Sequence, residues 1–126
     1  MGRINIIFGW LWLLAGLLLG AYLQFKMGSS PEWMDSHQRM LWKAFHTHAS
    51  MLAIMNIVYG YGLERAKMGS LLRATGGFLA IIGTILFSGV LFLAGIKYGL
   101  AKIAFLGTWC VILAIIILLS GLIKKS

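Results

Sequence analysis

The residues from Trp42 to Tyr59 read WKAFHTHASMLAIMNIVY, and this stretch decides the kind of fold the chain adopts. Its length and apolar content are typical of a membrane-spanning helix. It nevertheless carries two histidines, an asparagine and a tyrosine, where a helix facing only lipid would carry leucine. On a helix that turns 100° per residue, His48, Asn56 and Tyr59 share one face, and His46 points almost the opposite way. We therefore expect His48 to face a pocket with Asn56 and Tyr59, and His46 to contact a different neighbour.

The rest of the chain has the composition of an integral membrane protein. Hydrophobic residues make up 60% of its 126 residues, in long runs separated by clusters of charge. The runs predict one all-α transmembrane domain, residues 1–126, folded as a four-helix membrane bundle with helices at about 4–25, 31–63, 71–94 and 103–123. The second of these helices exceeds the thickness of a bilayer core, so its first turns should lie in the interface or project from it.

Local signals near the helix ends refine this picture. Ser30 suits the N-cap of the second helix, Pro31 its first position and Glu32 its first turn. Trp33 suits the membrane interface as an aromatic anchor. Asn5, close to the start of the first apolar run, is expected to face headgroups or water.

The formal net charge of +8 raises the question of nucleic acid. The basic residues, however, flank the apolar runs, where they suit anionic lipid headgroups, and they form no surface that reads bases. Slightly more of them lie on the side of the two termini, which favours cytoplasmic termini. We expect membrane lipids as partners, no nucleic acid, and a location in a bacterial inner membrane.

Haem b is the cofactor that the histidines fit best. Neutral imidazole is a common ligand of transition metals and haem iron, and histidine is uncommon within a membrane helix. The rings of His46 and His48 diverge by about 160°, so they cannot both hold one ion. Haem needs only one axial imidazole, an apolar slot and basic partners for its propionates. The expected axial ligand is His48, with His46 and His37 as alternatives, and the propionate partners are Lys43, Arg39 and Lys102.

Structural interpretations of the same residues remain open. His48 and His46 would also serve as hydrogen-bonded contacts between helices, and Asn56 as an interhelical hydrogen-bonder. Tyr59 would also serve as an interface anchor, and His37 as a solvated interface residue.

Several features occur together in the chain: Ser30-Pro31-Glu32 followed by Trp33, histidine and asparagine on the next helix, a basic connection, and a glycine-rich third helix with Leu86-Phe87-Ser88. With these features the chain resembles styrene oxide isomerase and its small relatives, four-helix membrane proteins that bind haem b. The resemblance implies a trimer in which a histidine of the second helix, from a neighbouring subunit, holds the iron. It also implies that ferric iron acts as a Lewis acid on a small hydrophobic epoxide, which rearranges to a carbonyl compound.

The resemblance assigns the ligand to His48, or to His46 in a shifted register, whereas alignment from Ser30 favours His37. Asn56 is the nearest match to the asparagine that orients the epoxide in that family. Its spacing from His48 is longer than in the isomerase.

The family's tyrosine on the third helix has no counterpart here. Thr84 or Ser88 would have to replace it, or Tyr59 would have to reach across from the second helix. Asn56 and Tyr59 are therefore the expected catalytic pair.

Two other classes of function stay open. One is an electron carrier or accessory subunit of a membrane redox complex, in which a second axial histidine closes the iron to substrate. The other is a structural or transport protein without a cofactor. The apolar runs carry no acidic residue, which weighs against proton-coupled transport. We expect a homo-oligomer in each case, because four glycine-rich helices leave little room for a cofactor within one subunit.

Overall fold

The structure is a computed structural model that describes residues 1–29, 36–94 and 96–124. The described chain is helical almost throughout, as the sequence predicts. Its elements are α1 (Gly2–Ser29), α2 (Ser36–Arg65), α3 (Ser70–Thr84), the π-helical turn η1 (Ile85–Gly89), α4 (Val90–Ala94), the 3₁₀ segment η2 (Tyr98–Ile103) and α5 (Ala104–Ile123).

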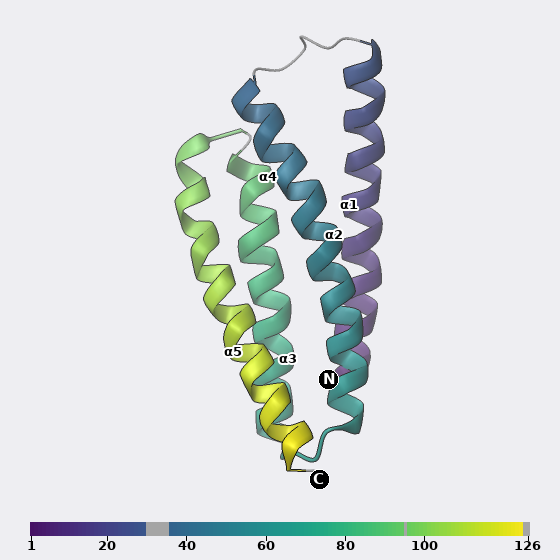
Figure 1. The fold of residues 1–126 in the computed structure, drawn as a ribbon, viewed down its shortest axis with the longest axis vertical. Helices are drawn as coiled ribbons and strands as arrows, with labels where there is room; N and C mark the ends of the chain where they lie inside the picture. Colours follow the sequence, from purple (N-terminus) through teal and green to yellow (C-terminus); the bar gives the residue numbers. More distant parts are fainter. Residues whose placement is uncertain (30–35, 95, 125–126) are drawn as a thin grey trace.

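The helices form an up-and-down bundle with both termini at the same end (Figure 1). α3, η1 and α4 follow one another as a single rod, so the bundle has four rods, as expected. α1 packs mainly on α2, and α5 packs mainly on α3. The bundle is therefore two helix pairs side by side, joined through α2 and the α3–α4 rod.

The boundaries of the described helices agree with the expected ones within a few residues. The third helix differs from the expectation in its backbone geometry. The third helix was expected to be continuous from 71 to 94, but it contains the π-helical turn Ile85–Gly89. Single π-turns inside α-helices occur often at functional sites, because they change the direction in which neighbouring side chains point. The expected helix start at Ser30 and Pro31 lies outside the described residues.

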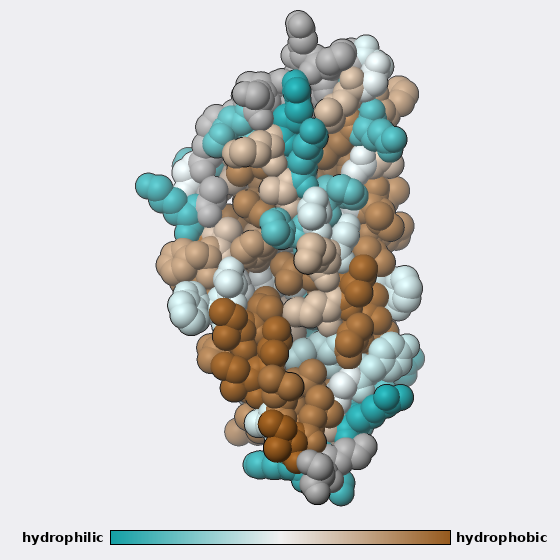
Figure 2. Space-filling model, viewed as in Figure 1, coloured by the Kyte–Doolittle hydropathy of each residue, from teal (hydrophilic) through white to brown (hydrophobic). Residues whose placement is uncertain are grey.

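Three of the four rods are long and apolar enough to cross a membrane: Gly2–Ser29, Ser70–Ala94 and Ala104–Ile123. α2 does not reach the same hydropathy, because charged residues and histidines occupy its first half. The surface around these rods is largely apolar; Leu11 and Val58, for example, are both 63% exposed. Figure 2 shows apolar side chains over the body of the bundle, with hydrophilic ones concentrated toward its two ends. These features are consistent with an integral membrane protein.

The interior, by contrast, is rich in small and polar residues beside a few large apolar ones such as Leu63. A Cβ atom added to Gly107 would lie 2.6 Å from the carbonyl oxygen of Gly83 and 2.9 Å from the Cα of Phe87. α5 therefore approaches the α3–η1 backbone as closely as glycine allows. Such close contacts are the usual basis of helix association in lipid, where apolar side chains gain nothing by leaving the hydrocarbon.

Candidate functional site

The interior of the bundle holds a network of buried amides and hydroxyls. Asn5, Asn56 and Thr84 are all fully buried, with 0% exposure. Asn5 Nδ2 donates to Asn56 Oδ1 at 3.1 Å and to the Gly77 carbonyl at 3.0 Å. Asn56 Nδ2 donates to Thr84 Oγ1 at 2.6 Å and to the Ala80 carbonyl at 3.4 Å. The network joins α1, α2 and α3, and the expectation that Asn5 faces headgroups or water is wrong.

Tyr59 also points into the bundle. Its side chain is 2% exposed and belongs to a core cluster with Leu63, Ala80 and Ala114. Its hydroxyl donates to the Ala114 carbonyl at 2.7 Å, which ties α2 to α5. Tyr59 is thus a buried helix-to-helix contact and does not lie at the membrane interface.

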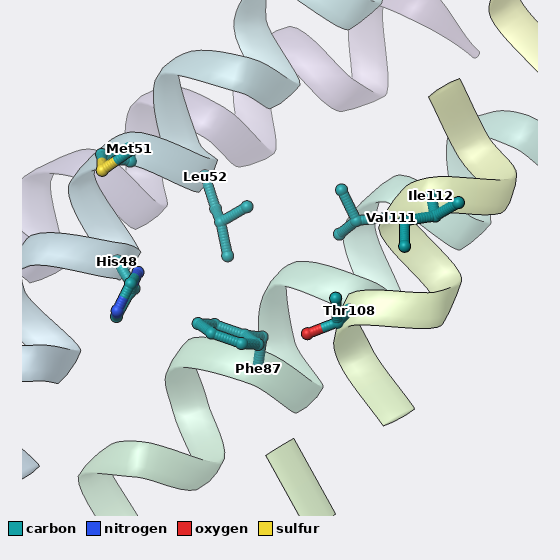
Figure 3. Close-up of a pocket in the computed structure, with 7 residues that line it drawn as sticks. All are labelled: His48, Met51, Leu52, Phe87, Thr108, Val111 and Ile112. Atoms are coloured by element: carbon teal, nitrogen blue, oxygen red, sulfur yellow. The ribbon is translucent and has the colours of Figure 1, made fainter. Parts of the chain in front are cut away.

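His48 lies at a separate pocket, between α2, η1 and α5 (Figure 3). Its ring meets the ring of Phe87 edge-on, with centroids 4.9 Å apart and planes at 84°. Neither ring nitrogen of His48 makes a hydrogen bond with a described residue. The pocket has a volume of about 190 Å³ and is lined by His48, Met51, Leu52, Phe87, Thr108, Val111 and Ile112. His48 and Thr108 are the polar members of that lining.

The structure does not bring the whole expected site together. Asn56 and Tyr59 do not line the His48 pocket, although helical geometry puts them near the same face of α2. Asn56 turns toward α1 and α3, and Tyr59 turns toward α5 at a level further along the helix. Beside His48, the residue of this face that lines the pocket is Leu52, one helical turn further along α2.

His46 contacts a different neighbour, as expected. Its Nδ1 lies 2.8 Å from the carbonyl oxygen of Gly16 on α1. Because a carbonyl oxygen only accepts, Nδ1 carries the hydrogen of this bond. The ring lies against Gly20, where an added Cβ would be 2.5 Å from Nδ1 and 2.9 Å from Nε2. Gly20 is therefore the residue that gives the ring its place between α1 and α2.

The expected propionate partners do not border the His48 pocket. Lys43 lines the pocket beside His46, on the α1 side of α2. Arg39 and His37 lie in the first two turns of α2 and line neither of these two pockets. Within the described residues, no group of three or more His, Cys, Asp or Glu side chains could hold a metal ion.

Two lining groups on other helices were not predicted from the sequence. Phe87 presents its ring to His48 from η1, and Thr108 contributes the second polar group from α5. The spacing of Thr108, Val111 and Ile112 at i, i+3 and i+4 marks one helix face. The sequence shows this spacing, but it does not show which helix the face contacts.

Comparison with known proteins finds no matching family model, no matching curated protein and no matching solved structure.

Proposed function

We propose that the chain is a membrane haem b protein in which His48 is the axial ligand. The observation that carries the proposal is the His48 imidazole, which opens on an apolar pocket and makes no hydrogen bond with a described residue. An unpaired polar group in an apolar medium costs several kcal/mol, roughly 2–7 depending on the reference. A coordinated metal is one of the few partners that satisfies an imidazole nitrogen in such surroundings.

The pocket fits the chemistry of haem, but one chain does not enclose it. Met51, Leu52 and Phe87 offer the apolar and aromatic contacts that a porphyrin needs. The volume of about 190 Å³ falls below the roughly 300–1,000 Å³ of pockets that enclose drug-sized ligands. Met51 is 62% exposed, so the pocket is open on the outer side of α2. The proposed haem therefore lies between copies of the chain, which agrees with a homo-oligomer and with the trimer that the resemblance implies.

The residues of the pocket also limit what catalysis the proposal allows. When bound, ferric haem with an open position supplies a Lewis acid for a small hydrophobic epoxide. Asn56 and Tyr59 are engaged in hydrogen bonds elsewhere, so neither is available to orient that substrate. Thr108 is the lining residue whose hydroxyl suits this role. The basic partner for the haem propionates is then Lys102, which is exposed in η2, six residues before Thr108 in sequence.

The test is the visible absorption spectrum of the detergent-purified protein, oxidised and reduced. We expect a Soret band that His48→Ala abolishes and that His37→Ala and His46→Asn retain. A high-spin ferric spectrum would support an open position for substrate, and a low-spin spectrum would support the alternative, an electron-transfer or accessory subunit. A colourless protein from haem-replete cells would refute both and leave a structural or transport role.

We also propose that both termini lie in the cytoplasm of a bacterial inner membrane. α1 and α3 begin and α2 and α5 end at the terminal end of the bundle (Figure 1), so the residues at these helix ends lie there: Arg3, Arg65, Lys67, Arg73 and Lys124. Such residues favour the cytoplasmic side when they lie in short loops. A C-terminal fluorescent fusion should then fluoresce, and a C-terminal alkaline phosphatase fusion should be inactive; the reverse pair of results would invert the topology.

A further inference from the structure

A second pocket lies between α1 and α2, on the side of α2 away from the His48 pocket. Its volume is about 330 Å³, and it is lined by Gly20, Leu23, Gln24, Met27, Lys43 and His46. Three different polar groups meet there: an ammonium, a side-chain amide and an imidazole. The proposed haem function uses none of them.

His46 is held in one orientation at this pocket. Its Nδ1–H donates to the Gly16 carbonyl at 2.8 Å, and its ring rests on Gly20. The other nitrogen, Nε2, makes no hydrogen bond with a described residue. In the neutral ring, Nε2 then offers a lone pair, which requires a hydrogen-bond donor on the ligand.

Lys43 contributes the positive charge. It is exposed and makes no ion pair with a described residue. Gln24 is exposed as well, and its amide can donate to the same anionic group. A ligand that matches all three groups carries an anion for Lys43 and Gln24, and a hydroxyl for His46.

The depth of the pocket points to a lipid. α1 has 28 residues, about 42 Å at 1.5 Å per residue, against about 30 Å of hydrocarbon. A bilayer centred on α1 has its hydrocarbon boundary near Gln24, so the pocket straddles that boundary. Leu23 and Met27 supply apolar walls, and Lys26 adds positive charge in the last turn of α1.

We infer that this pocket binds the headgroup of an anionic phospholipid that carries a hydroxyl, as phosphatidylglycerol does. The phosphodiester anion contacts Lys43 and the Gln24 amide. A phosphodiester has no proton at neutral pH, so the glycerol hydroxyl supplies the hydrogen that His46 Nε2 accepts. A choline headgroup offers no donor hydrogen, and its quaternary ammonium repels Lys43.

The test compares two anionic lipids by native mass spectrometry of the detergent-purified chain: phosphatidylglycerol, and phosphatidylmethanol, which has the same charge but no hydroxyl. We expect phosphatidylglycerol to bind about three- to tenfold tighter, the range of one hydrogen bond. His46→Asn should remove this difference, because asparagine keeps an N–H for Gly16 but its shorter side chain places no acceptor at the position of Nε2. Lys43→Gln should weaken both lipids, and the matched control Lys97→Gln should weaken neither.

Two results would overturn the inference. One is equal binding of the two lipids by the unaltered chain. The other is displacement of the lipid by millimolar glycerol 3-phosphate, which would make a soluble phosphate the ligand. The melting temperature of each variant verifies that it is folded. If His46→Asn unfolds, the comparison of Lys43→Gln with Lys97→Gln still tests the inference, because Lys43 is exposed. Because the haem proposal rests on His48, loss of the Soret band in His48→Ala and loss of lipid selectivity in His46→Asn are independent results.

Discussion

Replacing Asn56 by alanine tests whether this residue holds the bundle together or orients a substrate. The side chain is fully buried between three helices. It accepts from Asn5 at 3.1 Å and donates to Thr84 at 2.6 Å, with a longer contact of 3.4 Å to the Ala80 carbonyl. Asn56→Ala removes all of these interhelical bonds at once.

The expected loss of stability follows from these bonds. Polar pairs inside membrane bundles contribute about 0.6 kcal/mol on average and about 1.7 kcal/mol at most. The bonds to Asn5 and Thr84 are short, at 3.1 and 2.6 Å, whereas the 3.4 Å contact to Ala80 is too long to add much. The substitution also leaves one hydrogen of the buried Asn5 amide without its partner, at a cost of about 1–3 kcal/mol. With about 0.6 kcal/mol for each of the two bonds and about 1–3 kcal/mol for the unpaired amide hydrogen, we expect a total loss of about 2–4 kcal/mol.

The assay is reversible unfolding in mixed micelles with increasing dodecyl sulfate, combined with a double-mutant cycle with Asn5→Ala. We expect a coupling energy between the two sites of about 0.6 kcal/mol or more. Thr75→Ala is the control, because among the described residues this exposed hydroxyl bonds only to the Leu71 carbonyl of its own helix. Its effect should stay within about 0.5 kcal/mol.

An unchanged stability of Asn56→Ala with no coupling to Asn5 would refute the structural role argued from the hydrogen bonds. Combined with a loss of epoxide turnover, that result would return Asn56 to the catalytic role that the family resemblance implies.

Two further substitutions test how the helices approach one another. Gly107→Ala should lower stability by about 1–3 kcal/mol, because the new methyl group meets backbone atoms of Gly83 and Phe87 and forces α5 away from α3. Gly28→Ala, in the last turn of α1 with nothing within 4 Å of the added Cβ, should not lower the melting temperature, and an equal loss in the two variants would contradict the packing. Tyr59→Phe should lower the free energy of unfolding by about 1 kcal/mol in the same assay, because it removes only the hydroxyl that donates to the Ala114 carbonyl. An unaltered unfolding midpoint would mean that this bond contributes nothing to stability.

Much of the fold was readable from the sequence, because the membrane imposes strong constraints. Long apolar runs must form helices in lipid, and the charged clusters between them mark where each helix ends. The predicted helices at about 71–94 and 103–123 therefore match α3 to α4 and α5 closely. The π-turn at Ile85–Gly89 was not readable, since it depends on how η1 meets the neighbouring helices and not on hydropathy.

The candidate site was readable only in part. The opposite directions of His46 and His48 follow from helix geometry alone, and the structure confirms that they contact different neighbours. The partners of Asn56 were not readable, because hydropathy does not say which helix lies against a given face. Asn5 on α1, near one end of the sequence, proved to be its hydrogen-bond partner.

The sequence by itself determined that this chain is helical and rich in apolar surface, and that two histidines of one helix face apart. Local periodicity and hydropathy are properties of short segments, so a sequence carries them directly. Only the tertiary structure decided that Asn56 and Tyr59 hold helices together while His48 opens on an apolar pocket with Phe87 and Thr108. Those assignments depend on contacts between residues distant in the chain, which exist only once the helices have packed.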